Sequence, residues 1–390
     1  RLKEHARGLG LSLVGVASVE PSDHLELYTR WVEDGKHGEM AYLAREDALA
    51  RRFDLRGTLA SVRSAVVVGD EYFQEDPPRV PTDPARAVIA RYARGQDYHD
   101  TLKKKLLDLH RWVEASVEGS VEGRVYVDTG PLLERELALR AGLGWFGKNT
   151  MLIHPKRGSY FFLGVLLLDL DLDTDVPFQE DHCGTCRSCL DKCPTGALLG
   201  RDASGAPVMD ATRCISYLTI EHRGPIPAEL RPLMGNRVYG CDICQEVCPW
   251  NERFARPAAE ESYGAREGLD GPTLVELASE LLNLNDEEFR TLFRKSPIKR
   301  AKRAGLLRNL CVALGNWGAE DAVPILVRAV GDGEALVRGH AAWALGRVGG
   351  GQARESLQEM LEEETDSWVR KEIVDAVRCA GDPVQALRTD

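Results

Sequence analysis

The sequence predicts a multidomain α+β protein whose three zones differ in pattern. Apolar runs typical of strands alternate with helical stretches up to about residue 175, and eight cysteines then crowd one short region. The last zone is helical and contains an internal repeat. A chain of 390 residues is long enough for two or three cores. We therefore expect domains over residues 1–175, 176–260 and 261–390.

The first zone holds four short runs that are rich in β-branched and aromatic residues. They are Ser64–Gly69, Ala87–Ala90, Arg124–Val127 and Tyr160–Leu168. Between them, Tyr98–Glu118 and Pro131–Ala141 carry apolar residues at helical spacing, and Gly142 lies just past the second helix. This alternation indicates an α/β domain, with an α+β domain as the alternative.

The cysteines of the second zone follow a spacing that is specific for iron–sulfur clusters. The first run is Cys183-x2-Cys186-x2-Cys189-x3-Cys193-Pro194, the pattern of bacterial two-cluster ferredoxins. In that pattern the first three thiolates hold one cluster, and the fourth cysteine reaches across to the other cluster. The zone therefore predicts a ferredoxin-like module with two [4Fe–4S] clusters.

A second run, Cys241-x2-Cys244-x3-Cys248-Pro249, matches the last three positions of the same pattern. Its missing first cysteine leaves Cys214 as the remaining ligand in the zone. The predicted ligand sets are Cys183, Cys186, Cys189 and Cys248 for cluster one, and Cys193, Cys214, Cys241 and Cys244 for cluster two. The alternative is a pair of four-cysteine zinc sites, but the x2-x2-x3-Cys-Pro spacing favours clusters.

The other two cysteines, Cys311 and Cys379, lie on apolar faces of predicted helices, and we expect them to be buried without a redox role. The clustered cysteines occur in a chain with no apolar leader at its start and no apolar run of about 20 residues. We therefore expect a cytoplasmic protein with no membrane partner, and we expect a monomer.

A glycine pattern, Gly142-x-Gly144-x-x-Gly147, formally matches the dinucleotide-binding fingerprint. It follows a predicted helix and precedes an extended segment, whereas the fingerprint needs a strand before it and a helix after it. We reject a dinucleotide site and predict a glycine-rich turn that brings Lys148 and Asn149 close to a ligand.

Asp128 stands at the end of the strand that ends at Val127. A carboxyl group there can face a cavity and donate a proton. The alternative is an N-cap for the helix that starts at Pro131. The same ambiguity applies to Arg91 and to the pair Tyr98 and His99, which are as compatible with packing as with catalysis.

Four segments together resemble the epoxyqueuosine reductase family, which is related to reductive dehalogenases. They are Ala90-Arg-Tyr-Ala-Arg-Gly-Gln-Asp-Tyr-His99, Val127-Asp-Thr-Gly-Pro131, Gly142-Leu-Gly-Trp-Phe-Gly-Lys-Asn149 and Asn236-Arg-Val-Tyr-Gly-Cys-Asp-Ile-Cys-Gln-Glu-Val-Cys-Pro-Trp250. The resemblance covers nearly the whole chain, including Arg308-Asn309 and Ala313-Leu-Gly-Asn316.

The resemblance implies a cobalamin in the first domain, two [4Fe–4S] clusters, and a tRNA that carries epoxyqueuosine in its anticodon. It also implies that Asp128 is the proton donor. Cobalamin contacts are expected from the matching motifs, at Arg91, Tyr98, His99, Lys148, Asn149 and Thr150. Histidine-ligated corrinoid proteins use Asp-x-His-x-x-Gly, whereas here Asp97-Tyr-His99 is followed by Leu102 in the glycine position. We therefore expect base-off cobalamin.

The helical zone carries repeats of about 30 residues, in which Leu307-Arg308 and Ala313-Leu-Gly315 recur as Val337-Arg338 and Ala344-Leu-Gly346. A weaker copy starts at Val369-Arg370. This spacing is typical of HEAT-like repeats, which usually present a binding face.

Within this zone, residues 289–319 contain eight basic residues and no acidic one, although the whole chain carries a formal charge of −11. Such a segment predicts contact with tRNA phosphates, and the alternative is a solvated helix face. The candidate contacts are Arg223, Arg237, Arg294, Lys295, Lys299, Arg300, Lys302, Arg303 and Arg308.

The predicted activity is the reduction of epoxyqueuosine at the tRNA wobble position to queuosine, with electrons passed from an external low-potential donor through the clusters to cobalamin. One alternative is a corrinoid iron–sulfur reductase of a small molecule, which has no need of the basic repeat. Another is an electron carrier whose repeats dock a protein partner.

Overall fold

The computed structural model describes residues 1–80 and 82–380, with side chains up to residue 378. The chain forms two compact units, each assembled from three segments. Unit 1 consists of Arg1–Glu75, Gly95–Cys214 and Asp242–Gly264, and unit 2 of Asp76–Arg94, Ile215–Cys241 and Ala265–Asp390. No helix of the described residues is both long and apolar enough to cross a membrane.

Unit 1 is built on a four-stranded sheet with the order β1-β2-β7-β4. The strands are β1 (Leu13–Ala17), β2 (Ser64–Glu71), β4 (Gly123–Tyr126) and β7 (Phe161–Leu168). Every neighbouring pair is antiparallel. Three of the four predicted strands are confirmed as β2, β4 and β7 of this sheet. The α/β class expected for this zone is wrong, because the sheet contains no parallel pair, and α+β holds.

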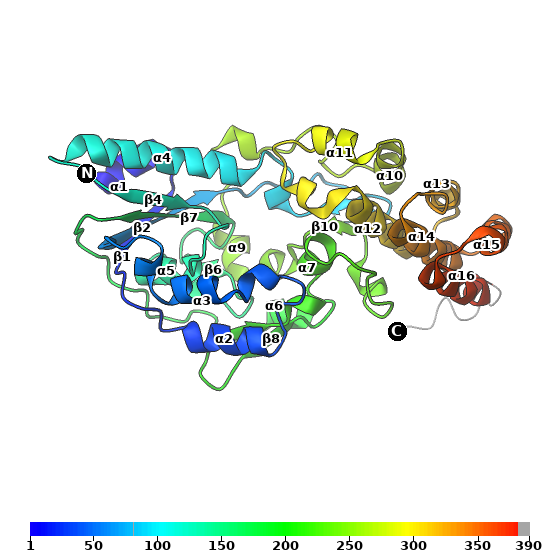
Figure 1. Cartoon of the computed structure of the whole chain (residues 1–390), viewed down its shortest axis with the longest axis horizontal. Coiled ribbons are helices and arrows are strands. Elements are labelled where there is room, and N and C mark those ends of the chain that lie inside the picture. Colours follow the sequence, from blue (N-terminus) through cyan, green and yellow to red (C-terminus); the bar gives the residue numbers. More distant parts are fainter. Residues whose placement is uncertain (81, 381–390) are drawn as a thin grey trace. The chain divides into compact units, whose positions relative to one another are not determined.

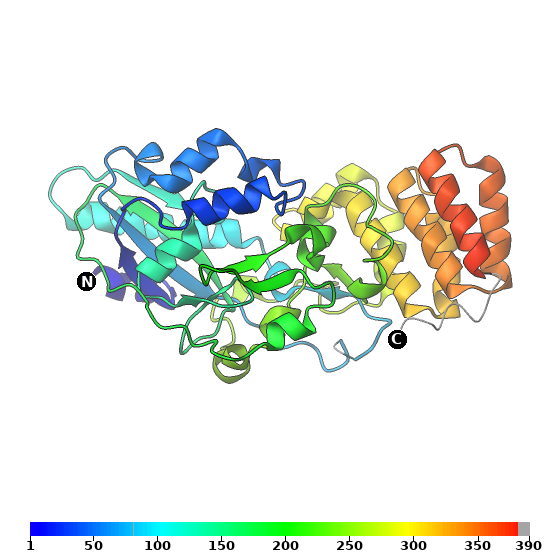
Figure 2. The same ribbon diagram turned by 90° about the horizontal axis from the view of Figure 1, so that it is seen from below.

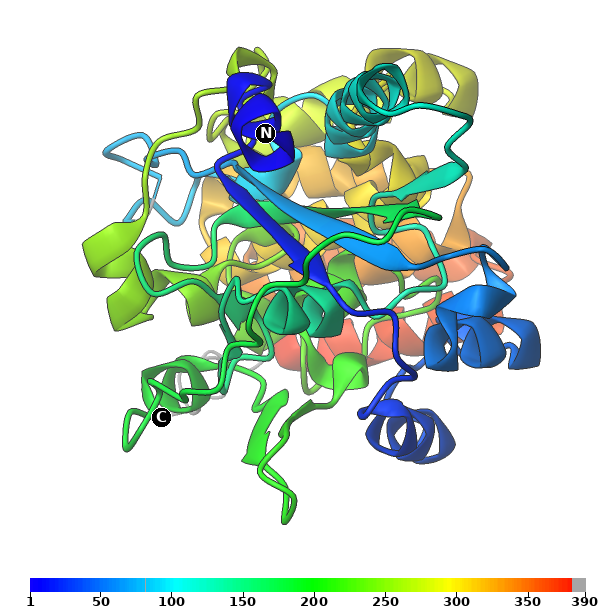
Figure 3. The ribbon, with the colours of Figure 1, turned by 90° about the vertical axis from the view of Figure 1, so that its left-hand side faces the viewer.

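Helices cover both faces of this sheet (Figures 1 and 3). Helix α4 (Tyr98–Ser116) packs on one face, where a Cβ on Gly164 of β7 would lie 2.8 Å from Leu106. Helix α5 (Glu134–Arg140) packs on the other face, in a core that includes Leu137, Ala138 and Val165. Since both faces are buried, β1, β2 and β7 are apolar at most positions, which is the pattern that resembles a parallel sheet.

The remaining elements of unit 1 are short. The helices are α1 (Leu2–Gly8), α2 (Leu25–Glu33), α3 (Glu46–Phe53), α6 (Ser188–Lys192), α8 (Ile243–Glu246) and α9 (Pro249–Phe254). One antiparallel hairpin pairs β5 (Trp145–Phe146) with β6 (Leu152–Ile153), and another pairs β8 (Leu198–Arg201) with β9 (Pro207–Met209). The glycine-rich segment thus leads into strand β5 and not into a helix, which agrees with the rejection of a dinucleotide site.

Unit 2 is mostly helical. Its one pair of strands in the described residues is β3 (Val88–Ile89) with β10 (Arg237–Tyr239), in parallel. Its helices are α7 (Ile215–Ile220), α10 (Leu274–Leu282), α11 (Asp286–Leu292), α12 (Lys302–Trp317), α13 (Val323–Ala329), α14 (Ala335–Val348), α15 (Gly351–Glu363) and α16 (Ser367–Ala380). The last five stack one after another (Figure 2).

The glycine of each repeat marks the place where successive helices of unit 2 approach each other. A Cβ on Gly315 of α12 would lie 2.9 Å from the Cα of Ala344 of α14. A Cβ on Gly346 of α14 would lie 2.7 Å from the Cα of Ala376 of α16. The Ala-Leu-Gly motif therefore recurs because the next helix needs the room of a missing side chain. Cys311 is buried as expected, and the side chain of Cys379 lies outside the described residues.

Candidate active site

Asp128 occupies a turn directly after β4, with a left-handed backbone at φ 57° and a side chain that is 64% exposed. Its backbone N–H donates a hydrogen bond of 2.7 Å to Oε1 of Glu134. The N-cap of α5 is Leu133, so the N-cap alternative for Asp128 is wrong. A helix residue instead holds the Asp128 backbone, and the carboxylate remains open to solvent.

Two residues of the α4 N-terminus hold the Asp128 carboxylate. The Tyr98 hydroxyl donates to Oδ2 of Asp128 at 3.0 Å, and Nε2 of His99 lies 3.4 Å from the same oxygen. Nδ1 of His99 lies 2.6 Å from Oδ1 of the buried Asp97. The Tyr98 ring stacks on Phe162 of β7, with ring centroids 4.1 Å apart. The structure thus brings together Tyr98, His99 and Asp128, which are separate in the sequence.

Two groups beside Asp128, His99 and Glu134, are protonated at neutral pH. Burial alone would lower the pKa of His99, but hydrogen bonds to Asp128 and Asp97 and the charges of both carboxylates raise it to about 9. Burial, together with the negative charge of Asp128, raises the pKa of Glu134 to about 8. Two protonated groups therefore flank an exposed carboxylate, which suits proton donation to a bound substrate.

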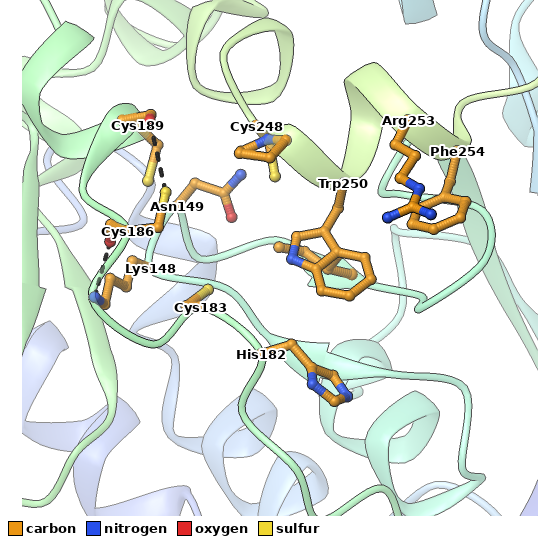
Figure 4. Close-up of a pocket in the computed structure, with 13 residues that line it drawn as sticks. Lys148, Asn149, His182, Cys183, Cys186, Cys189, Cys248, Trp250, Arg253 and Phe254 are labelled. Carbon is orange, nitrogen blue, oxygen red and sulfur yellow. Dashed lines mark hydrogen bonds between the residues drawn. The ribbon is translucent and has the colours of Figure 1, made fainter.

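A cavity of about 270 Å³ in unit 1 is lined by Cys183, Cys186, Cys189 and Cys248, the four ligands predicted for cluster one. Three of these cysteines come from the loop around α6, and Cys248 faces them from the start of α9 (Figure 4). Helix α6 also packs against α8, which contains Cys244 of the second run.

The four thiols crowd one another around this cavity. Burial and the neighbouring thiolates of Cys183, Cys248 and Cys186 raise the pKa of Cys189 to about 11. Bound iron relieves such crowding because it stabilises thiolates. In the described residues, no group of three or more His, Cys, Asp or Glu side chains is arranged to hold a metal ion. The choice between a cluster and zinc at these cysteines stays a prediction from their spacing.

The glycine-rich turn approaches this cysteine loop. Nζ of Lys148 donates to the carbonyl oxygens of Gly184, at 2.6 Å, and Cys186, at 2.9 Å. Nδ2 of Asn149 donates to the carbonyl oxygen of Cys244 at 3.1 Å. The next residue, Thr150, has a left-handed φ of 64°. Lys148 and Asn149 were predicted to lie close to a ligand. In the structure their side chains bind the peptide groups of the cysteine segments.

Three of the cysteines predicted for cluster two, Cys193, Cys214 and Cys244, belong to unit 1. Cys241 ends a segment of unit 2, one residue before unit 1 resumes. The second ligand set therefore stays a prediction.

Comparison with known proteins places the chain in a family. A family model described as "Epoxyqueuosine reductase QueG, DUF1730" matches residues 52–129, and models for a 4Fe-4S double cluster binding domain and for HEAT repeats match residues 182–251 and 299–378. The epoxyqueuosine reductase of Pseudomonas aeruginosa is 44% identical over 355 residues, which cover 89% of this chain and 94% of that protein. This chain belongs to the epoxyqueuosine reductase family.

Other members agree with that placement. The Escherichia coli epoxyqueuosine reductase is 38% identical and covers 88% of both chains. A solved structure of an epoxyqueuosine reductase with an epoxyqueuosine-modified stem loop of tyrosine tRNA is 30% identical, with a TM-score of 0.85 over 98% of both chains. The Streptococcus thermophilus enzyme is 28% identical, with a TM-score of 0.82 over 97% of both chains.

Most of the residues predicted to contact tRNA are exposed. The exposed ones are Arg223, Arg294, Lys295, Lys299, Arg300 and Lys302, and Arg237 is half-buried. Arg300 pairs with Glu221, and its carbonyl oxygen accepts a hydrogen bond from Arg223. Arg303 donates to Asp332 and to the carbonyl oxygen of Leu284.

Arg308 requires a correction, because it is 1% exposed. Its guanidinium donates to the carbonyl oxygens of Leu218, His222 and Gly224 and to the side chain of Asn309. These four partners use its donors inside unit 2. Arg308 therefore stabilises the packing of α12 against the 218–224 segment and does not reach solvent phosphates.

Arg91 is also buried, and its partner is Asp76, which Arg94 contacts as well at 2.6 Å. The expected cobalamin contact of Arg91 stays a prediction.

Two residues near the site had no signal in the sequence. Glu134 is an ordinary first-turn acid, and its bond to the Asp128 backbone depends on the turn. Arg52 of α3 is 8% exposed and lies over the Tyr28 ring at 5.2 Å, yet its Nη1 atom has no hydrogen-bond partner among the described residues. A buried guanidinium nitrogen without an acceptor is a donor that a bound ligand can satisfy.

The environment of His99 gives a testable pKa. We expect the His99 imidazole to titrate near pH 9 in the folded protein, and Asp97→Asn to lower that value because one of two carboxylate partners is lost. Asn preserves the N-cap of α4. Histidine NMR spectra recorded against pH test this, with His154 as an internal reference because burial and nearby basic residues lower its pKa to about 4.

The same shift sets the sign of a stability effect. The pKa of His99 is higher in the folded protein than its unfolded value of about 6.5. The ion pairs of His99 therefore stabilise the fold fully below about pH 6.5. This stabilisation is lost as the pH rises through about 9. The difference in Tm between the wild type and His99→Gln should thus narrow from pH 6 to pH 10. Titration of His99 at or below its unfolded value would contradict the described geometry.

Proposed function

We propose that this protein reduces epoxyqueuosine at the tRNA wobble position to queuosine. The observation that carries the proposal is the exposed carboxylate of Asp128, held by Tyr98 and His99 in the same unit as the four-thiol cavity. The membership of the chain in the epoxyqueuosine reductase family supports the substrate.

The reaction takes two electrons and two protons, and the epoxide oxygen leaves as water while an alkene forms. Asp128 would give a proton to the departing oxygen, because its carboxyl group is the exposed acid of the site. His99 and Glu134 are the groups that can return protons to it, since each has a pKa raised above neutrality. Tyr98 would keep the carboxyl group facing the substrate.

Electrons would enter from an external low-potential donor through two [4Fe–4S] clusters on the predicted ligand sets. Cys183, Cys186, Cys189 and Cys248 fit cluster one, because they line one cavity and crowd one another. Cys193, Cys214, Cys241 and Cys244 would hold cluster two. The double-cluster family match over residues 182–251 includes all eight.

Base-off cobalamin would supply low-valent cobalt, a strong reductant and nucleophile, for opening the epoxide. The fit rests on Arg52, whose buried Nη1 lacks an acceptor, because the phosphodiester and amide groups of cobalamin are acceptors. The charges of Arg52 and Arg135 both lower the pKa of Tyr28, and the charge of Asp128 raises the pKa of Arg135. These four residues therefore lie in one region of unit 1. Further contacts would come from Arg91, Tyr98, His99, Lys148, Asn149 and Thr150.

The exposed basic residues of unit 2 would hold the anticodon arm through its phosphates. Lys295 and Lys302 both have left-handed backbones, at φ 57° and 61°, on either side of the short 3-10 helix Pro297–Ala301. Both lysines are exposed, so phosphates can reach them.

The reaction is tested by mass spectrometry of nucleosides from epoxyqueuosine-containing tRNA, after anaerobic incubation with the reconstituted protein, cobalamin and a low-potential reductant. We expect the loss of one oxygen mass. Asp128→Asn should abolish this loss, because an amide cannot donate the required proton, while Asp173→Asn, at an exposed loop acid, should leave it unchanged. An unchanged nucleoside with both clusters and cobalamin bound would overturn the proposal.

Arg52→Met should weaken cobalamin binding about 10- to 100-fold, because a charge-assisted hydrogen bond contributes roughly 1.5–3 kcal/mol. Absorption titration of the apoprotein with cobalamin measures the affinity. The matched control is Arg51→Met, a change at the exposed neighbour on α3, which should bind as the wild type does. Equal affinities of both variants would remove Arg52 from the cofactor site.

Lys295→Gln should lower the slope of log Kd against log salt by about 0.7–0.9, the value for one lost phosphate contact. Binding of the anticodon stem loop at several salt concentrations gives the slope. Lys103→Gln, an exposed change on α4 of unit 1, is the control and should keep the wild-type slope. If both variants have the same slope, the contact at Lys295 is absent.

A further inference from the structure

A buried indole donates a hydrogen bond to one of the cysteines of the cavity. Nε1 of Trp145 lies 3.5 Å from Sγ of Cys183, and the Trp145 side chain is 3% exposed. A buried indole N–H usually finds an acceptor, and here the acceptor is a sulfur atom of the predicted cluster ligand. In the described structure that sulfur belongs to a thiol, which stands in for the iron-bound thiolate.

The β5–β6 hairpin fixes the direction of this bond. Trp145 pairs with Ile153 across the hairpin, and Gly144 before it has a φ of 156°, where a Cβ would lie 2.1 Å from the Ile153 carbonyl oxygen. The indole also packs against Phe178 and Trp250, with ring centroids 5.7 and 5.0 Å away. The ring is therefore held on several sides, and its N–H stays directed at Cys183.

Lys148 reinforces the same loop from three residues farther along. Its ammonium group donates to the carbonyl oxygens of Gly184 and Cys186. These bonds hold the loop against the hairpin and place a positive charge beside it. The hairpin therefore presents two donors to the cysteine loop, one to a sulfur and one to its peptide groups.

Donors of this kind change the electron affinity of an iron–sulfur cluster. Reduction adds negative charge that is shared by the cysteine sulfurs, so an N–H···S bond is stronger in the reduced state than in the oxidised state. Hydrogen bonds to the sulfurs are among the main determinants of cluster potential. A fixed indole donor at Cys183 thus stabilises the reduced form.

We infer that Trp145 is a tuning residue that raises the reduction potential of the cluster held by Cys183, Cys186, Cys189 and Cys248. The inference rests on the proposed ligand set of cluster one. Its consequence is that this cluster accepts electrons from the external donor more readily than the thiolates and the open cavity alone would allow.

The chain offers a matched control at Trp250. This indole lines the same cavity and contacts Trp145 edge to face, but within the described part of the chain it donates no hydrogen bond to a cysteine sulfur. Trp145→Phe and Trp250→Phe each remove one indole from the cavity region and keep an aromatic ring. Only the first removes an N–H···S bond, so a difference between them isolates the hydrogen bond from the packing.

The test is a redox titration of the anaerobically reconstituted holoprotein, followed by electron paramagnetic resonance, with iron and sulfide analysis of every sample. In Trp145→Phe we expect the midpoint of one cluster to shift to lower potential while the other stays in place. Trp250→Phe should keep both wild-type midpoints. Electron–nuclear double resonance of the reduced wild type after exchange into D2O should reveal an exchangeable proton near the cluster that Trp145→Phe lacks.

Two outcomes would overturn the tuning role by itself, without touching the proposed ligand set. One is a Trp145→Phe protein with full iron and sulfide content and wild-type midpoints, which leaves the ligand set intact but removes the tuning role. The other is a shift of equal size in Trp250→Phe, which would assign the effect to packing. A protein whose Cys183→Ser variant keeps both clusters with unchanged spectra would instead refute the ligand set, and the inference with it.

Discussion

Unit 1 depends on the burial of both faces of one four-stranded antiparallel sheet. The pairing of β2 with β7 over eight residues, from Ser64 with Leu168 to Glu71 with Phe161, places two long apolar strands at its centre. Helices α4 and α5 must then cover opposite faces, because each face is apolar. The site follows from this arrangement: Asp128 comes from the end of β4, and Tyr98 and His99 from the start of α4, which packs beside it.

The proton side of the site combines strain with compensating contacts. A left-handed backbone at a residue other than glycine costs about 1–3 kcal/mol, and Asp128 adopts one at φ 57°. The bond from its N–H to Glu134 and the bonds from Tyr98 and His99 to its carboxylate offset that cost. The strained turn therefore holds one carboxyl group in solvent next to two groups, His99 and Glu134, whose pKa values are raised above neutrality.

Four cysteines line one cavity of unit 1, and burial together with neighbouring thiolates raises the pKa of two of them, Cys189 and Cys248. In the proposed assignment, a polynuclear iron centre binds all four as thiolates. The glycine-rich hairpin completes this region, because Trp145 and Lys148 donate to the cysteine loop from one side. Under the proposed ligand set, the same short motif links the local backbone geometry of β5 to the electron affinity of the cluster.

Features that depend on local spacing could be predicted from the sequence. Examples are the strands of the first zone, the four cysteines that line one cavity, and the repeat with its Ala-Leu-Gly motif. Each depends on residues that stand at a characteristic spacing along the chain. Even Cys248, which is distant from Cys183, was assigned from spacing, since the ferredoxin pattern pairs the two runs.

Features that depend on which segments meet were decided by the tertiary structure. Strands buried on both faces look alike in parallel and antiparallel sheets, so the class of unit 1 required its pairing. Arg308 belongs to a basic run but is enclosed by carbonyl oxygens some 90 residues away, from Leu218 to Gly224. Arg52 stands out because one of its nitrogens has no hydrogen-bond partner among the described residues. Glu134 and Trp145 each stand out through one hydrogen bond, to the backbone of Asp128 and to the sulfur of Cys183. The sequence determined which residues carry the chemistry of cysteine and carboxylate, whereas burial and hydrogen-bond partners, which are properties of contacts between distant segments, decided how each of them can act.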